Sequence, residues 1–390
     1  MQAARPAGLA PIIPPAPKVH AKDLPAWRLI RDFPKDTLST WPDYAFDVPI
    51  NRRRTFGIDG VLINDPDGVR HVMATAAQNY TRSVAFVRIF RPVVGNGLIL
   101  AEGAAWRAQR RMLAPVFTPA SVARLLPHFH LAADDLVRRL DGQPTANLSA
   151  AFQDATLEAV LRALFTLTDV DRRQRLAGMV RSYMAGPGTP TILDGFSRSE
   201  HSWPWAQRGR RAFQGNWFAA VDEIVTERRA RSTSDNPADM LDLLLAARDA
   251  DAGERLSAEQ VRDQCATMLL AGFETTSRLL FWACYLLCLD QPEQDRLRAD
   301  IASFPPARVI AIDDLRRWPS VRETLLETLR LYPSAPVLTR EAIAPDSILG
   351  VDIQPGAQIF ISPWVIHRHR RYWEQPSAFI PTRFKDKPSP

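Results

Sequence analysis

A threonine, a glutamate and a glycine lie close together in a long apolar stretch, and their spacing suits proton delivery to a small ligand. Residues 271–276 have the sequence AGFETT. Thr275 follows Ala271 by four residues, so on a helix its hydroxyl can donate to the Ala271 carbonyl and open a small polar groove. Gly272 removes a side chain beside that groove, and Glu274 adds a carboxyl group that can supply protons. An ordinary core helix with a tolerated glycine and a satisfied threonine explains the same residues.

One long helix must carry this group. Residues 256–289 are mainly apolar and predict a single helix of about 32 residues, which spans about 48 Å at 1.5 Å per residue. Ser257 and Gln260 have the spacing of a capping box at its start, and Asp290 and Pro292 close its end. Such a helix crosses a whole domain.

Composition favours a large, mainly α protein. The chain has 390 residues, of which 46% are hydrophobic, and stretches with the alternation of a strand are sparse. The net charge is +6, and nearly all the positive side chains are arginines interspersed with acids. This pattern predicts a solvated surface rather than a nucleic-acid groove, while a local basic face for an acidic protein partner stays open.

Neither a metal site nor a membrane span is predicted. All three cysteines lie on the long helix: Cys265, Cys284 and Cys288. They have no metal-binding spacing and suit core thiols in a reducing, cytoplasmic compartment. Residues 266–289 approach the length of a membrane span, but Glu274 and Arg278 would be costly in lipid. Residues 1–21 are rich in proline and lack the apolar run of a signal peptide, so we predict a flexible leader.

Two other pairs of side chains are three or four residues apart, so on a helix they share one face and could act together. Trp106 and Arg110 are four residues apart on a helix predicted over 103–117, and two donors on one face suit a carboxylate or a phosphate. An amphipathic helix with solvated arginines is the alternative. Glu327 and Arg330 are three apart on another helix, where a surface ion pair worth little is the ordinary interpretation.

The remaining elements follow from periodicity and from turn residues. Further helices are predicted over 23–33, 67–75, 119–140, 148–167, 219–231, 237–250, 292–303 and 319–331. A hairpin is predicted over 53–63, and further strands over 337–342, 348–353 and 358–361. Residues 76–101, which contain VVGNG at 93–97, are predicted to be loop-rich. Residues 179–218, which contain several glycines, are predicted to be irregular, as a mobile lid, an access channel or a packed loop. His367 and His369 lack a third metal ligand and are predicted to be solvated.

Four stretches together resemble the cytochrome P-450 family, the haem-thiolate monooxygenases. They are WRAQR at 106–110, AGFETT at 271–276, ETLR at 327–330 and PTRF at 381–384, in the order and approximate spacing of the family. The resemblance runs from about Lys22 to Phe384. It predicts one domain over residues 22–390, after the leader.

The resemblance implies a triangular, mostly helical fold with a small β-rich lobe, and haem b as the cofactor. It places Ala271 and Gly272 beside the iron-bound oxygen and matches Thr275 and Glu274 to the family's alcohol and acid. The other matching positions are the haem-propionate donors Trp106 and Arg110, with Arg340 as a further candidate, and the buried structural triad Glu327, Arg330 and Arg383.

Three departures from the family pattern matter. Thr382 stands where PTRF usually has a glutamate, and Arg278 follows Glu274 by four residues, a spacing that can hold the acid ionised. The family's cysteine loop, which carries the proximal thiolate, should follow PTRF, yet the sequence ends at Pro390. The three cysteines present lie on the distal helix. We therefore expect a fold incomplete at its C-terminus, without a metal ligand and inactive as it stands.

The implied reaction is insertion of one oxygen atom of O2 into an apolar organic substrate. An acidic ferredoxin-type protein and its NAD(P)H reductase are the implied electron donors. Two alternatives remain: an oxygen-independent peroxygenase or isomerase, and a haem-free remnant with a binding role.

Overall fold

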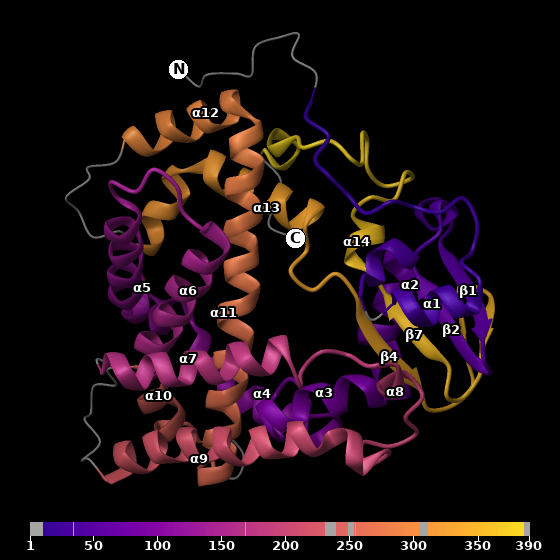
Figure 1. Ribbon diagram of the computed structural model, residues 1–390, viewed down its shortest axis with the longest axis horizontal. Coiled ribbons are helices and arrows are strands. Elements are labelled where there is room, and N and C mark those ends of the chain that lie inside the picture. The colour runs from indigo at the N-terminus through magenta and orange to yellow at the C-terminus, as the bar shows by residue number, and fades with distance from the viewer. Residues whose placement is uncertain are drawn as a thin grey trace. The chain divides into compact units, whose positions relative to one another are not determined.

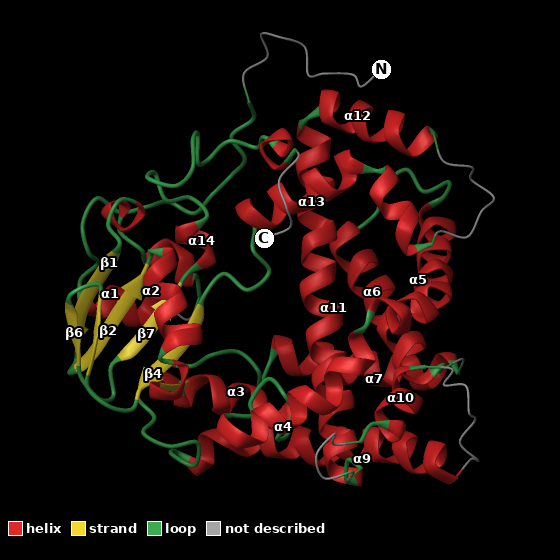
Figure 2. Ribbon diagram, turned by 180° about the vertical axis from the view of Figure 1, so that it is seen from behind, coloured by secondary structure: helices red, strands yellow, loops and turns green. Residues whose placement is uncertain are grey.

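The computed structural model describes residues 11–33, 35–167, 169–230, 239–248, 253, 255–303 and 311–385. The chain forms two compact units (Figure 1). Unit 1 comprises residues 1–86, 282–306 and 317–390, and unit 2 comprises residues 87–281 and 307–316. The division falls inside the longest helix, after Phe281. In the described chain all the strands belong to unit 1, while unit 2 is built from helices (Figure 2).

Unit 1 combines a small sheet with short helices. Its strands are β1 Ile50–Thr55, β2 Ile58–Ile63, β3 Tyr80–Arg82, β4 Leu338–Ala342, β5 Asp346–Ile348, β6 Val351–Ile353 and β7 Gln358–Ile361. Its helices are α1 Ala26–Asp32, α2 Pro66–Arg70, α12 Gln291–Ala302, α13 Pro319–Leu331 and α14 Pro363–Ile366. The predicted strand over 348–353 is in fact part of the two-stranded hairpin β5–β6.

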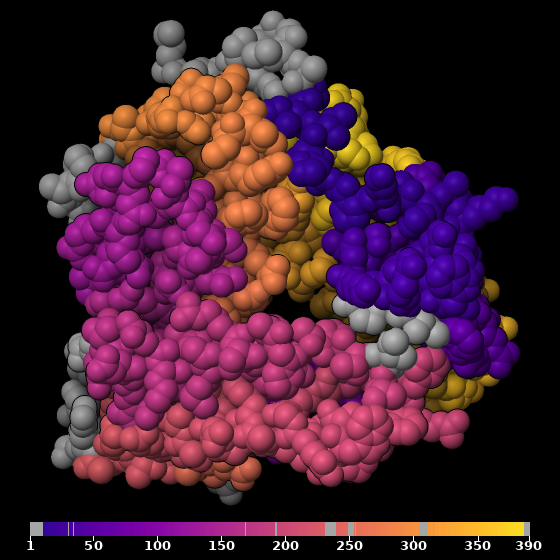
Figure 3. Space-filling view, in the orientation of Figure 1, coloured from indigo at the N-terminus to yellow at the C-terminus, as the bar shows by residue number. Residues whose placement is uncertain are grey.

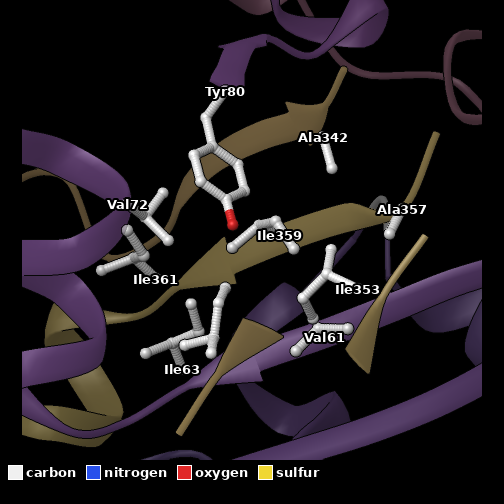
Figure 4. Close-up of a cluster of buried hydrophobic side chains, with 10 residues drawn as sticks. Val61, Ile63, Val72, Tyr80, Ala342, Ile353, Ala357, Ile359 and Ile361 are labelled. Atoms are coloured by element: carbon white, nitrogen blue, oxygen red, sulfur yellow. The ribbon is translucent and has the colours of Figure 1, made fainter. Parts of the chain in front are cut away.

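The main sheet of unit 1 has the order β1-β2-β7-β4-β3 and buries both faces of β2. Side chains alternate along a strand, so Val61 and Ile63 face one core while Leu62 faces the other. The first core gathers Val61, Ile63, Val72, Tyr80, Ala342, Ile348, Ile353, Ala357, Ile359 and Ile361 (Figure 4). Burial on both faces accounts for the continuous apolar runs of β2 and its parallel partner β7.

Unit 2 contains most of the long helix α11, Ala258–Leu289. Its other helices are α3 Val84–Val94, which begins just before the unit, α4 Gly103–Leu113, α5 Pro119–Leu140, α6 Leu148–Phe165, α7 Val170–Ala185, α8 Ile192–Gly195, α9 Arg208–Ala230 and α10 Met240–Ala246. The predicted capping box of α11 is confirmed. The Ser257 N–H donates to the Gln260 Oε1 at 2.8 Å, and the Gln260 N–H donates to the Ser257 Oγ at 3.1 Å.

Two stretches predicted to lack regular structure contain helices. The region 76–101 holds β3 and α3, although Pro92 lies inside α3. In the region 179–218, α7 extends to Ala185 and α9 begins at Arg208. Packing explains the second case, because the buried Trp217 anchors α9 through its indole N–H to the Val93 carbonyl at 2.8 Å. Tertiary contacts thus outweigh the low helix propensity of the glycines there.

Residues 11–20 of the predicted leader contact the rest of unit 1. The Phe379 N–H donates to the Ile12 carbonyl at 2.8 Å, and the Tyr332 hydroxyl donates to the Pro15 carbonyl at 2.7 Å. Residues 1–10 of the leader lie outside the described residues.

The two histidines predicted to be solvated are mostly buried. His369 is fully buried, and burial lowers the pKa of His367 to about 4. Among the described residues no group of three or more His, Cys, Asp or Glu side chains is arranged to bind a metal. None of the described helices has the length and apolar character needed to cross a membrane.

Candidate functional site

The centre of α11 carries the predicted backbone contact. The Thr275 hydroxyl donates to the Ala271 carbonyl at 2.7 Å. Both residues are exposed and lie one turn apart, so the contact is on an open face of the helix within unit 2. The bond fixes the direction of the Thr275 hydroxyl on this face.

Glu274 is held by the arginine one turn beyond it. The Arg278 Nε donates to the Glu274 Oε1 at 2.7 Å. The two side chains differ in exposure, 17% for Glu274 and 57% for Arg278. The carboxyl group is therefore sheltered, while its partner is in solvent, where the pair contributes little to stability.

At Gly272 the helix α6 lies close against α11. A Cβ atom at this position would lie 2.9 Å from the Val160 Cγ2, which real Cβ atoms do not tolerate. One turn earlier on α6, the Thr156 hydroxyl lies 3.1 Å from the Phe273 carbonyl. The missing side chain of Gly272 thus admits a neighbouring helix on the α6 side of α11.

The predicted donor pair lies on α4 in unit 2. Trp106 and Arg110 are both exposed, and Arg110 has no carboxylate partner among the described residues. Arg340 lies on β4 in unit 1, where its Nη1 donates to the Thr339 carbonyl at 2.8 Å. Because Arg340 and the α4 pair belong to different units, their common role stays a prediction.

A polar network that the sequence did not reveal fixes α4 against α11. The Gln264 Nε2 donates to the Gln109 Oε1 at 2.9 Å, and the Gln109 Nε2 donates to the Asn96 carbonyl at 3.0 Å. The backbone N–H groups of Leu98 and Asn96 donate to the side chains of Gln264 and Asp263, at 3.1 and 2.8 Å. Satisfied buried networks of this kind hold elements in one arrangement. The signal in the sequence was the pair of glycines in VVGNG.

Replacing Gly97 by alanine should lower the free energy of unfolding by about 1 to 3 kcal/mol through overpacking. Its Cβ would overlap the Thr267 Oγ1 and lie 2.7 Å from the Asp263 carbonyl. The control is Gly215→Ala on α9, where a Cβ meets no atom within 4 Å. The control should gain up to about 1 kcal/mol from helix propensity. Urea unfolding of both variants checks this, and equal stabilities would show that the close approach is absent.

Unit 1 contains a buried carboxylate between two arginines. Glu327 is fully buried. Its carboxylate accepts two hydrogen bonds from Arg330, from Nε at 2.7 Å and from Nη2 at 2.8 Å. The Arg383 Nε donates to the same carboxylate at 3.0 Å, and the Ile380 N–H does so at 2.8 Å. The interpretation of Glu327 and Arg330 as a surface pair is therefore wrong, and the structure brings all three predicted triad residues together.

The same arginines also anchor the segment that leads to PTRF. Arg330 donates to the carbonyls of His367 at 2.8 Å, Pro376 at 2.7 Å and Ala378 at 2.8 Å. The ring of Trp373 lies 5.0 Å from the Arg330 guanidinium and 5.9 Å from that of Arg383. The triad therefore fixes residues 367–383 onto α13.

Unit 2 has a second triad of the same kind, which the sequence did not reveal. The Arg88 Nε donates to the Asp194 Oδ1 at 3.0 Å, and Arg210 donates to both carboxylate oxygens at 2.6 and 2.8 Å. Burial alone would raise the pKa of Asp194, but hydrogen bonds from Arg210, Thr191 and Arg88 outweigh it and bring the pKa to about 2. Asp194 therefore stays ionised.

This second triad decides between a lid and a packed loop for residues 186–207. Arg210 donates to the carbonyl of Pro187 at 2.8 Å, and Arg88 donates to those of Glu200 at 3.2 Å and Ser202. The segment is thereby tied to α3 and α9 at several points. It is a packed loop.

Known proteins match the chain in both sequence and fold. The sequence profile described as cytochrome P-450 matches residues 49–389. The protein LUTEIN DEFICIENT 5, chloroplastic, of Arabidopsis thaliana is 28% identical over 366 residues, which cover 87% of this chain and 60% of that protein. Carotene epsilon-monooxygenase, chloroplastic, of the same plant is 28% identical over 363 residues, with 86% and 65% covered. The chain thus spans under two thirds of the length of these relatives.

A solved structure supports the fold. The retinoic acid bound cyanobacterial CYP120A1 superposes with a TM-score of 0.77 at 20% identity, covering 96% of this chain and 82% of that one. This likeness confirms the predicted fold class, mainly α with a small β-rich lobe. Because the family profile matches most of the residues, the chain belongs to the cytochrome P-450 family.

Proposed function

We propose that the protein is a haem-dependent monooxygenase that inserts one oxygen atom of O2 into an apolar organic substrate. Proteins of this family bind haem. The observation that supports the activity is the Thr275 hydroxyl on the Ala271 carbonyl, with the sheltered Glu274 beside it on an open face of α11. This acid and alcohol also favour monooxygenation over the oxygen-independent alternative.

The residues of the chain suit one face of a haem group, the face that would lie toward α11. The exposed donors Trp106 and Arg110 suit the propionate carboxylates, and the small side chain of Ala271 leaves room on α11. When bound, haem supplies the oxidation chemistry, while the protein binds, orients and delivers protons. The other side does not fit as well, because all three cysteines belong to α11. Burial raises the pKa of Cys265, which makes a thiolate there unfavourable.

The proposed task of the α11 residues is to hold and move protons. The Glu274 carboxyl would be the proton reservoir, and the Thr275 hydroxyl would hold and pass on the proton. Arg278 donates to the Glu274 carboxylate and so holds it in place on the helix. Once released from this partner, the Glu274 carboxyl would be a better proton carrier.

Thr275→Ala should therefore divert reduced oxygen to peroxide with little effect on substrate binding, because it removes one hydroxyl and little volume. Thr276→Ala is the matched control, since Thr276 is also exposed but does not bond Ala271. Arg278→Ala should hold or raise turnover. Product formed per NAD(P)H consumed, with peroxide counted, distinguishes these variants. Unchanged coupling in Thr275→Ala would remove its proposed role, and collapse of turnover in Arg278→Ala would make the arginine part of the relay.

This experiment needs a preparation with thiolate-ligated haem. The reduced carbon monoxide complex of such a preparation has a red-shifted Soret band. We expect the 390-residue chain by itself to lack that band, because its cysteines all belong to α11. A red-shifted band from this chain would identify one of the three as the ligand.

The proposed substrate is an apolar hydrocarbon or a close derivative. This class is supported by the similarity to a carotene epsilon-monooxygenase and to a structure with bound retinoic acid.

The proposed electron donor is an acidic ferredoxin-type protein, itself reduced by an NAD(P)H reductase. Arg107 and Arg111 are exposed on α4 and form a cationic face. Reversing both charges with glutamate should slow reduction and weaken its dependence on salt. The control is the same double reversal at the exposed Arg208 and Arg211 of α9. Unchanged reduction rates in the α4 variant would place the donor elsewhere.

A further inference from the structure

The turn of α11 that carries the candidate site is rich in hydroxyl donors. Besides the bond made by Thr275, the Ser277 Oγ donates to the Glu274 carbonyl at 2.9 Å. The Thr156 Oγ1 lies 3.1 Å from the Phe273 carbonyl. Three carbonyls of this one turn therefore face a side-chain hydroxyl in addition to a backbone N–H. Two of the hydroxyls belong to α11 itself, whereas Thr156 belongs to α6.

Helix α6 lies directly against this turn, within unit 2. In Figure 3 the purple surface that includes α6 borders the orange surface that includes α11. Phe152, Thr156 and Val160 follow one another at intervals of four residues on α6 and so share one face. Val160 occupies the space beside Gly272, and Thr156, one turn earlier, meets the carbonyl of the next residue, Phe273.

The contact of Thr156 with α11 is buried. Thr156 is 6% exposed and Phe273 is 1% exposed, so water does not compete for the carbonyl, and a hydrogen bond there is stronger than at the surface. The Thr156 Oγ1 also lies 2.8 Å from the Phe152 carbonyl and 3.3 Å from the Gln153 carbonyl, both on α6. The hydroxyl has one proton, and rotation of the O–H bond alone moves it between these acceptors and α11. Donation to α11 therefore needs no movement of α6.

A second donor on a helix carbonyl weakens the carbonyl's own bond to the N–H four residues on and tilts the carbonyl outward. At Phe273 this carbonyl faces α6. Phe273 is two residues from Ala271 and from Thr275, so it lies about 200° around the helix from each. Thr156 thus acts on this turn from the side opposite to the exposed face that carries Ala271 and Thr275.

We propose that Thr156 is a positioning residue for the proton relay of α11, a role that rests on the proposed function of Thr275. The Thr156 hydroxyl on the Phe273 carbonyl keeps the turn slightly open, and this sets the direction in which the Thr275 hydroxyl bonds Ala271. Thr156 acts through the backbone of α11 alone, because it is buried on the side of the helix away from Thr275.

Amide exchange in the 390-residue chain tests the contact by itself. Thr156→Val removes the hydroxyl with almost no change of volume, and Thr156→Ser keeps the hydroxyl. The amide hydrogens of residues 272–279 should exchange about fivefold faster in the valine variant, the factor for one hydrogen bond of typical net strength. The serine variant should exchange at nearly the wild-type rate.

The control for amide exchange is Thr328→Val on α13. The Thr328 hydroxyl is also buried, but it donates to the Thr324 carbonyl of its own helix at 2.7 Å. This variant should leave the exchange of residues 272–279 unchanged. Wild-type exchange in Thr156→Val, or an equal increase in the control, would overturn the proposal.

The coupling of oxygen reduction to product tests the role in the relay, in the preparation with thiolate-ligated haem. Thr156→Val should raise the peroxide formed per NAD(P)H consumed, and Thr156→Ser should restore the wild-type ratio. Because Thr156 acts through Thr275, the double variant Thr156→Val, Thr275→Ala should form no more peroxide than Thr275→Ala alone. A double variant whose two effects add would show that Thr156 acts independently of Thr275, and would overturn the positioning role.

The single variants separate a failure of this proposal from a failure of the proposed function. If Thr275→Ala loses coupling and Thr156→Val keeps it, the relay stands and only the role of Thr156 fails. If both variants keep wild-type coupling, the relay itself is absent and the positioning role fails with it. Faster amide exchange in Thr156→Val would then report only the packing of α6 on α11.

Discussion

Replacing Glu327 by glutamine should cost about 3 to 5 kcal/mol of the free energy of unfolding, the loss typical of breaking a buried ion pair. Glutamine keeps the shape of the side chain but removes the charge that compensates two arginines. The Arg330 side chain is only 1% exposed and that of Arg383 only 12%, so neither can turn to water. The carbonyls around Arg330 accept its hydrogen bonds but do not neutralise it.

The control for this prediction is Asp295→Asn on α12. Asp295 and Arg298 have the same i, i+3 spacing as Glu327 and Arg330, but both are more than half exposed. Their loss should cost under about 1 kcal/mol. Chemical unfolding of the two variants measures the difference directly. Similar small losses in both would mean that burial does not make the Glu327 triad critical.

Asp194→Asn should cause a loss of similar size in unit 2, about 3 to 5 kcal/mol, because it strands two buried guanidinium groups. Arg88 and Arg210 are 1% and 5% exposed. The segment 186–207 should also exchange its amide hydrogens faster, since the arginines that hold its carbonyls lose their anchor. Asp154→Asn is the control, because Asp154 pairs with a single exposed arginine. If amide hydrogens of residues 186–207 exchange at the same rate in Asp194→Asn as in the wild type, the prediction is contradicted.

The same substitution should change how stability depends on pH. The pKa of Asp194 is about 2 in the folded protein, below its ordinary value of 3.8. A depressed pKa contributes stability that is complete above pH 3.8 and is lost as pH falls toward 2. Wild-type protein should therefore lose stability more steeply than Asp194→Asn across this interval. Parallel acid-unfolding curves would show that the triad does not hold Asp194 ionised.

Contacts between near neighbours in the chain could be predicted from the sequence. The capping box of α11, the Thr275 hydroxyl on Ala271 and the Glu274 to Arg278 pair all follow from spacings of three or four residues on a helix. Such contacts depend only on the helix forming. The apolar pattern of residues 256–289 was enough for that.

Contacts between distant residues could not be predicted. Arg88 and Asp194 are 106 positions apart, and nothing in their local sequence indicates that they meet. The burial of Glu327 depends equally on Arg383, which lies 56 positions away. From spacing alone, Glu327 and Arg330 were interpreted as a surface pair. Only the family resemblance indicated the buried triad.

Glycines misled the prediction in a different way. In VVGNG they suggested a loose loop, whereas Gly95 and Gly97 lack side chains because α11 lies directly against them. Gly209 and Gly215 lie in the stretch predicted to be irregular, yet both are part of α9. A glycine in a sequence does not reveal whether it permits a turn or a close contact.

The ion pairs of both triads use arginine throughout, and this determines how the protein reacts with amine-directed reagents. The sequence has five lysines, at positions 18, 22, 35, 385 and 387, and none falls in unit 2. Acylating reagents and amine-directed cross-linkers therefore leave every ion pair of unit 2 intact. A lysine-specific protease cannot cut between Lys35 and Lys385 even when the protein is unfolded, and it releases residues 36–385 as one piece.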